Sequence, residues 1–185
     1  MERILVFHKP RGVIVTRIDE QGRKTMYDVL PNWVRKEKWL PVGRLDQDSR
    51  GMLLMVEDAK LIEILGAPGK LEKTYEVWVR GHVNETHLVS IREGIRSPVG
   101  ILHCKAIKVF GFVGPKTRLH VVLTEGKNRH IRRMFGALND PKYGTPLKVL
   151  DLKRIQIGPI QLDVPSGHWR FLSEQETHML LQSAG

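Results

Sequence analysis

Residues 73–80 read KTYEVWVR, and apolar and polar side chains alternate along this stretch. Tyr75, Val77 and Val79 fall on one face, while the residues between them form the other face. Because successive side chains of a strand point to opposite faces of a sheet, this pattern predicts a strand with one buried face.

Outward from this strand, the sequence predicts more strands than helices. Further strands are predicted at residues 3–9, 13–16, 39–42, 52–57, 100–110, 117–124, 148–157 and 160–164. Helices are predicted between Thr25 and Pro31, at 59–65, from the cap at Asn84 to 93, at 128–138, and after the capping box of Ser173 and Glu176. Strands in hairpin-like groups indicate an α+β fold with a mainly antiparallel sheet, not a doubly wound fold.

Size and charge narrow the class of protein. The length fits a single domain over residues 1–185, with room for two lobes, and a core that hides roughly 70% of the unfolded surface. Thirty Lys and Arg residues face 20 Asp and Glu residues, which gives a net charge of +10. This excess favours a polyanionic partner, because cations that bind phosphates release counterions. A basic protein without a nucleic-acid role is the alternative, and the sequence has no long basic amphipathic helix that would favour a membrane surface.

Cysteine use and apolar runs bear on location. Cys104 is the only cysteine, so an internal disulfide is impossible and a reducing compartment fits. The apolar run at residues 4–7 is too short for a signal peptide, and no stretch approaches transmembrane length. We therefore expect a cytoplasmic protein that binds no membrane, and we expect it to act as a monomer.

The first candidate for chemistry is a polar loop. Residues 43–51 read GRLDQDSRG, lie between two predicted strands and have a glycine at each end. A loop on a rigid sheet can hold a carboxylate at a binding site, and glycines let the backbone approach a ligand closely. The alternative is an ordinary solvated turn in which Asp46 or Asp48 caps a backbone amide, and composition alone favours that turn.

Two further segments could contact a ligand. Residues 125–135 read EGKNRHIRRMF and open an amphipathic helix whose arginines lie off the apolar stripe. Arginines at a helix start suit phosphate, so anion binding is favoured over a solvated helix face. Tyr75 has two interpretations that spacing cannot separate, a packed core side chain or a platform for an unpaired base.

Several other chemistries lack their sequence pattern. The sequence contains no phosphate-binding loop of the type G-x-x-x-x-G-K-[ST], no G-x-G-x-x-G and no G-x-S-x-G. Its eight histidines are scattered and Cys104 has no cysteine partner, so a zinc site is not expected.

Taken in order, the three segments resemble the RsuA-like family of pseudouridine synthases. Residues 43–53, GRLDQDSRGML, are similar to the family's G-R-L-D-x-x-[ST]-x-G-L-L. Residues 73–77 are similar to its K-x-Y-x-V, and residues 125–134 to its E-G-[RK]-N-R-Q-[VI]-R-R-M. Weaker matches lie at residues 7–12, 157–162 and 167–170, so the resemblance covers nearly the whole chain.

The resemblance implies a fold and an activity. The fold would be a sheet split by a catalytic cleft and flanked by helices, with no metal and no cofactor. The activity would be isomerisation of uridine to pseudouridine in RNA. The sequence has no room for the small S4 RNA-binding domain, which favours the branch acting on large-subunit (23S) ribosomal RNA. Asp46 would be the catalytic residue, as nucleophile at C1′ or as base at C2′.

The same resemblance implies residues that bind the RNA substrate. They are Arg44, Tyr75, Lys127, Arg129 and Arg132. Arg132 would pair with Asp46 and keep its carboxylate charged, and Tyr75 would lie against the uracil face. Two departures from the family, Arg50 for glutamate and His130 for glutamine, are expected to make their segments more basic. An irregular stretch at residues 139–146 is expected to affect how RNA is held.

Two other functions fit parts of the sequence. A non-catalytic RNA-binding factor, for example one that assists ribosome assembly, needs the positive charge but no Asp46–Arg132 pair. A glycosidase-like hydrolase needs a second acid at a set distance, for which Asp48 is the candidate.

Overall fold

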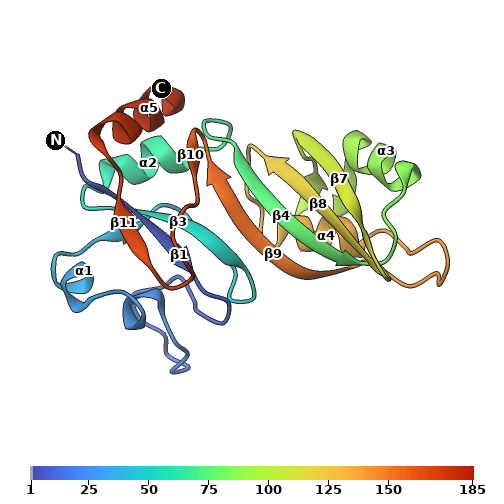
Figure 1. Cartoon of the computed structure of the whole chain (residues 1–185), viewed down its shortest axis with the longest axis horizontal. Helices are drawn as coiled ribbons and strands as arrows, with labels where there is room; N and C mark the ends of the chain where they lie inside the picture. Colours follow the sequence, from blue (N-terminus) through green and yellow to red (C-terminus); the bar gives the residue numbers. More distant parts are fainter. Residues whose placement is uncertain (1) are drawn as a thin grey trace. The chain divides into compact units, whose positions relative to one another are not determined.

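The computed structural model describes residues 2–185 and divides the chain into two compact units. Unit 1 comprises the chain up to Leu71 together with Lys153–Gly185, and unit 2 comprises Glu72–Leu152. One strand, β9 (Lys148–Ile157), begins in unit 2 and ends in unit 1. Figure 1 shows the elements of both units in sequence colours. The units match the two lobes that the length allowed, and organisation as a single domain stays a prediction.

Unit 1 is built on short strands around β1. Its strands are β1 (Ile4–Lys9), β2 (Leu40–Pro41), β3 (Arg50–Val56), the end of β9, β10 (Ile160–Gln161) and β11 (Trp169–Phe171). β1 lies between β11 and β3 and is antiparallel to both, whereas β3 is parallel to β9. β2 pairs with β3 and β10 pairs with β9, both antiparallel.

The central strand β1 is buried on both faces, which explains its unbroken apolar run. Ile4 and Val6 join one cluster with side chains of α2 (Lys60–Gly66) and α5 (Glu174–Ala184). Leu5 and Phe7 join a second cluster with side chains of the 3-10 helix η1 (Met26–Asp28) and α1 (Asn32–Lys36). Helices therefore cover both faces of these strands, as Figure 1 shows.

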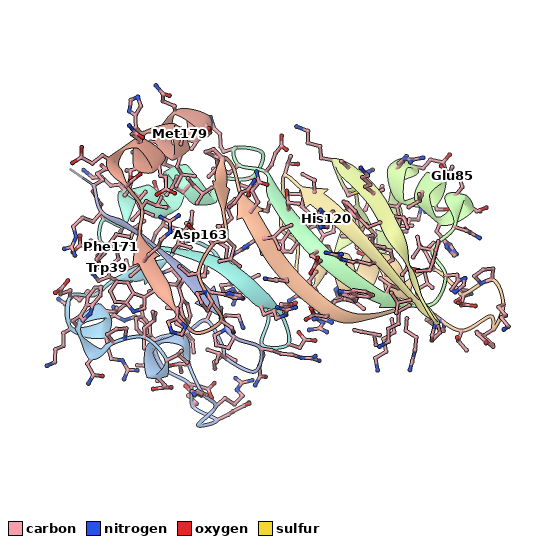
Figure 2. The ribbon with its side chains drawn as sticks, viewed as in Figure 1. Trp39, Glu85, His120, Asp163, Phe171 and Met179 are labelled. Atoms are coloured by element: carbon pink, nitrogen blue, oxygen red, sulfur yellow. The ribbon has the colours of Figure 1, made fainter. Side chains whose placement is uncertain are left out.

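Aromatic side chains support the outer strand β11. The ring centroids of Trp39 and Phe171 lie 5.6 Å apart, and Figure 2 shows the two residues side by side. The guanidinium of Arg3 lies 4.7 Å from the ring centroid of Phe171 and 5.3 Å from that of Trp39. Because Trp39 is fully buried, this cluster fixes β11 against β1 through packing and a cation–π contact.

Unit 2 is a second antiparallel assembly. Its strands are β4 (Lys73–Arg80), β5 (Ile95–Ser97), β6 (Gly100–Leu102), β7 (Ala106–Val113), β8 (Lys116–Leu123) and the start of β9. β8 lies between β4 and β7 and is antiparallel to both, and β5 and β6 form a separate hairpin. Two helices accompany them, α3 (Glu85–Glu93) and α4 (His130–Gly136). The predicted face of β4 is buried: Tyr75 is 7% exposed, and Val77 and Val79 are 0% exposed.

The structure confirms the predicted α+β class with a mixed, mostly antiparallel sheet flanked by helices. The caps at Asn84 and Ser173 are also confirmed, since each side chain accepts from the backbone N–H three residues later. Whether a cleft splits the sheet stays a prediction.

The short helix expected from the cap at Thr25 is present as a single 3-10 turn. Three local predictions were wrong. Residues 13–16 form only an isolated bridge, Ile14 to Thr25. The strand expected at 100–110 is interrupted at residues 103–105, because β6 pairs with β5 whereas β7 pairs with β8. The helix expected from residue 128 begins only at His130, because Arg129 adopts a left-handed conformation with φ of 51°.

Candidate functional site

The loop that carries Asp46 connects β2 to β3 in unit 1, is bonded to β3 at its start and contains an internal turn. The N–H of Val42 donates to the carbonyl of Leu54 at 2.8 Å, and the N–H of Ser49 donates to the carbonyl of Asp46 at 3.1 Å. Leu45 and Ser49 are buried, whereas Asp46 is only partly buried. Hydrogen bonds therefore hold the start of the loop to β3 and close a turn from Asp46 to Ser49.

A second segment, the turn after β1, holds the middle of the same loop. The N–H of Gly12 donates to the carbonyl of Gln47 at 2.7 Å. In return, the side-chain Nε2 of Gln47 donates to the carbonyl of Gly12 at 3.3 Å. Gln47, the residue after Asp46, is therefore bonded through its backbone and its side chain to Gly12, which lies 35 residues earlier in the sequence.

A buried lysine lies close to the loop's two carboxylates. The Lys9 side chain is 0% exposed, and its Nζ donates to the carbonyls of Val13 at 2.6 Å and Pro10 at 3.0 Å. Burial lowers the pKa of Lys9 to about 8, while the negative charges of Asp46 and Asp48 act in the opposite direction. Lys9 and Asp46 therefore interact electrostatically within unit 1.

A second buried cation belongs to the same neighbourhood. Arg154 is 3% exposed, and its Nε donates to the carbonyl of Met52 at 2.7 Å. Its positive charge also lowers the pKa of Lys9. Neither cation has a role that the sequence predicted. The only signal for Lys9 was its place in the weak match at residues 7–12, and no signal marked Arg154.

Arg44, a predicted RNA contact, lies in the same loop and is exposed. Among residues 2–185, no acidic side chain lies within ion-pair distance of Arg44. Its guanidinium is available to an external anion. Asp46 and Arg44 thus belong to unit 1, and the other predicted site residues belong to unit 2.

In unit 2, Tyr75 is buried on β4 opposite Val121 of β8. Burial agrees with the packed-core interpretation of this tyrosine. Stacking on a base stays a prediction.

In the basic segment of unit 2, Arg129 is exposed and adopts a left-handed conformation directly before α4. Arg132 is half-buried on α4, and its Nη1 donates to the carbonyl of Val149 at 3.2 Å. His130 is 4% exposed and lies within 2.9 Å of the carbonyl of His103. Burial lowers the pKa of His130, which disfavours its charged form.

Two other cations of the segment already have partners in the protein. The Nζ of Lys127 donates to the carbonyl of Ile101 at 2.7 Å and lies 3.1 Å from a carboxylate oxygen of Glu125. The guanidinium of Arg133 donates to the carbonyl and side-chain oxygens of Asn128, both at 3.0 Å. Both cations therefore help to shape the segment, and contact of Lys127 with RNA stays a prediction.

The described residues provide neither a cluster of metal ligands nor a membrane-spanning helix. Within residues 2–185, no group of three or more His, Cys, Asp or Glu side chains is arranged to hold a metal ion. In the same residues, no helix has both the length and the apolar character needed to span a membrane.

The structure thus places a hydrogen-bonded aspartate loop in unit 1 and an arginine-rich helix start in unit 2. The chain belongs to the RNA pseudouridylate synthase family, whose model matches residues 3–137. This confirms the resemblance drawn from the motifs.

Relatives and a solved structure agree with this family. The ribosomal large subunit pseudouridine synthase B of Haemophilus influenzae is 34% identical over 186 residues, which is 99% of this chain and 50% of that protein. The protein of the same name from Salmonella typhi is 36% identical over 181 residues, with coverage of 96% and 60%. The chain thus spans about half to three-fifths of the length of these curated relatives. A crystal structure of a pseudouridylate synthase superposes with a TM-score of 0.80 at 26% identity, covering 97% of this chain and 74% of that one.

Proposed function

We propose that this chain isomerises uridine to pseudouridine in large-subunit ribosomal RNA, with Asp46 as the catalytic residue and without a cofactor. Family membership and the names of the relatives support the reaction and the substrate class. The observation that carries the assignment of Asp46 is its loop, which is bonded to β3, to its own backbone and to the turn at Gly12. A carboxylate on such a loop has a defined position, as attack at one carbon atom requires.

The reaction rearranges the atoms of the uridine without adding or removing any. The bond between N1 and C1′ breaks, the uracil turns, and a bond forms between C5 and C1′. The C5 proton leaves and N1 ends with a proton, so the product is an isomer. Asp46 acts either as a nucleophile at C1′ or as a base at C2′. A primary isotope effect from deuterium at C2′ would identify the second route.

Charge around Asp46 suits either role. The buried Lys9 interacts electrostatically with Asp46, and both routes use a charged carboxylate as the reacting group. We propose that Arg132 is a further cation that stabilises this carboxylate during the reaction, and that Tyr75 contacts the uracil. A dry site would also retain the detached base, because water would otherwise compete for C1′.

The positive charge of the chain supports RNA as the partner. A net charge of +10 lowers the free energy of binding to a phosphate backbone and predicts a steep dependence on salt. Arg44, Lys127 and Arg129 are proposed phosphate or nucleotide contacts. Extrusion of a paired uridine costs a few kcal/mol, which such contacts can offset. We propose a monomer that works in the cytoplasm, where ribosomal RNA is available.

The deciding experiment compares the full chain with its Asp46→Asn variant on ribosomal RNA from cells that lack the gene. RNA labelled with tritium at uracil C5 releases tritium to water whenever C5 bonds to C1′. Asp46→Asn should lower the release at least about 10³-fold and leave RNA affinity within about twofold, because the amide lacks the charge but keeps the shape. Arg132→Ala should also lower the release, and Arg132→Lys should restore part of it.

Asp48→Asn is the matched control from the same loop. Isomerisation should survive this change to within about tenfold. If the chain were a two-carboxylate hydrolase, the parent would release free uracil and Asp48→Asn would lose that activity. Turnover by Asp46→Asn at the parent rate would refute the catalytic assignment. RNA binding by the parent without tritium release from any RNA would indicate the non-catalytic RNA-binding factor instead.

A further inference from the structure

A loop in unit 2, between α4 and β9, is folded around one buried carboxylate. Asp140 is 5% exposed and accepts from the backbone N–H groups of Lys142 at 2.8 Å, His82 at 3.0 Å and Tyr143 at 3.0 Å. The N–H of Gly144 donates to its carbonyl at 2.8 Å. Burial would raise the pKa of the Asp140 carboxyl, but the three N–H donors lower it below its usual value. The irregular stretch noted in the sequence is thus an ordered loop.

This loop borders a pocket of about 560 Å³ that lies wholly within unit 2. Its other walls come from the end of β4 and from the turn between β7 and β8. Figure 1 shows this loop, in orange, near the turn between β7 and β8. The volume lies in the range of pockets that bind small organic groups.

Two neighbouring cations beside the pocket, Arg80 and Lys116, lack acidic partners. Arg80, which lines the pocket, is directly opposite Lys116 in the pairing of β4 with β8. Both side chains are exposed, and like charges in this position repel each other. In the described part of the chain, no acidic side chain lies within ion-pair distance of Arg80 or Lys116. Lys142, by contrast, interacts with the negative charge of Asp140. An external anion between Arg80 and Lys116 would relieve their repulsion.

Exposed aromatic rings accompany these cations. Tyr143 lines the pocket and is 64% exposed, and the Nζ of Lys142 lies 5.0 Å from the centroid of its ring. Phe112 is 54% exposed, and its ring centroid lies 5.1 Å from that of His82. Aromatic rings close to cations are the combination that binds unpaired nucleotides, through base stacking and phosphate contacts.

We propose that this pocket binds one unpaired nucleotide of an RNA, with its base stacked on Tyr143 and its phosphate between Arg80 and Lys116. The site extends the proposed function, on which it rests only for RNA as the ligand. Tyr75 and Arg80 are five residues apart on β4, or about 17 Å along the strand, so the pocket does not include Tyr75. Its role is to hold RNA rather than to react with it.

The test measures affinity of the full chain for a short, fluorescently labelled single-stranded RNA, with the same RNA in a duplex for comparison. Tyr143→Ala should weaken single-strand binding about tenfold, whereas Tyr143→Phe should bind within about twofold of the parent because it keeps the ring. Arg80→Gln and Lys116→Gln should each lower the slope of log affinity against log salt by about 0.7. Duplex binding should respond less to Tyr143→Ala, because paired bases cannot stack on the ring.

Matched controls exclude general effects. Lys36→Gln removes an exposed cation of unit 1, and its single-strand affinity should fall less than that of Arg80→Gln. Equal thermal unfolding of parent and Tyr143→Ala would show that the fold is intact. Parent-like single-strand affinity of Tyr143→Ala and Arg80→Gln would overturn the proposal. So would binding of a polyglutamate peptide that depends on Tyr143 while RNA binding does not, since the occupant would then be an acidic protein segment.

The outcome is separable from that of the proposed function. Tritium release can be measured at saturating RNA, where the loss of a holding contact no longer limits turnover. Parent-like release by Tyr143→Ala with weakened binding supports both proposals. If neither the parent nor any variant released tritium, the catalytic proposal would be refuted. The RNA affinities would still test the proposed nucleotide pocket.

Discussion

Gly51 and Arg154 face each other across the parallel pair of β3 and β9, with their backbones in close contact. A Cβ atom at Gly51 would lie 2.3 Å from the carbonyl oxygen of Arg154 and 2.5 Å from its nitrogen. Gly51 also has a φ of 113°, which residues with a side chain rarely adopt. The end of the Asp46 loop therefore requires glycine both for backbone conformation and for space.

The first prediction concerns this glycine. Gly51→Ala should lower the free energy of unfolding by about 2–3 kcal/mol, because strain and a backbone clash act together. Urea unfolding at pH 7 measures the change. Gly22→Ala is the matched control: Gly22 also has a positive φ of 69°, but nothing lies within 4 Å of an added Cβ. Equal losses in the two variants would show that the contact with Arg154 contributes nothing.

The second prediction concerns Lys9 and pH. Its pKa falls from 10.5 in the unfolded chain to about 8 in the folded protein. Below pH 8 both states hold the proton, and the cost of burying the charge is fully present. Between pH 8 and 10.5 the folded state loses the proton first, so this residue makes the protein more stable as the pH rises. The full change is about 3 kcal/mol.

Lys9→Met removes this titration. The free energy of unfolding of the parent, relative to that of the variant, should therefore rise by about 2–3 kcal/mol between pH 7 and pH 10. Groups that titrate in both proteins cancel in this difference. Lys36→Met, at an exposed position on α1, should follow the parent's pH profile. A Lys9→Met profile parallel to that of the parent would mean that Lys9 is not a buried cation.

The third prediction concerns the last helix. Arg170 forms two hydrogen bonds with the carboxylate of Glu176, at 2.8 and 2.7 Å, and Glu176 also accepts from the N–H of Ser173. The hydrogen bonds from Arg170 are the main cause of a Glu176 pKa of about 2. A depressed pKa stabilises the folded state above the unfolded value of 4.5, and the stabilisation disappears as the pH falls towards 2.

Glu176→Gln should therefore lower the free energy of unfolding by about 1–2 kcal/mol at pH 7, after allowance for solvent screening, and by much less at pH 2.5. Denaturant unfolding at the two pH values measures both changes. Glu174→Gln alters the first turn of the same helix at an exposed position and should have a smaller effect at pH 7. A loss for Glu176→Gln that does not depend on pH would argue against the pair with Arg170.

Local sequence patterns predicted part of the fold well. The alternation at residues 73–80 predicted β4 and its buried face, and the caps at Asn84 and Ser173 predicted the starts of α3 and α5. Predictions were wrong where the secondary structure depends on a pairing strand or on a single backbone angle. Residues 13–16 had the composition of a strand but found no strand to pair with, and the left-handed Arg129 delays α4.

The candidate site shows the same division. Motif order located Asp46, Tyr75 and Arg132, since each sits in a short recognisable segment. The buried Lys9 and the pocket beside Tyr143 were not predicted, because neither has a pattern of its own. Burial of a lysine contradicts its usual preference, and only packing against specific neighbours reveals it.

The sequence by itself determined the alternating strands, the helix caps, the positive charge and the segment that carries Asp46, because these depend on residues within a few positions of each other. Only the tertiary structure decided that Gln47 bonds to Gly12, that Gly51 meets Arg154 and that Arg80 faces Lys116. These pairs are separated by 35 to 103 positions along the chain, so their contacts form only when distant segments pack together.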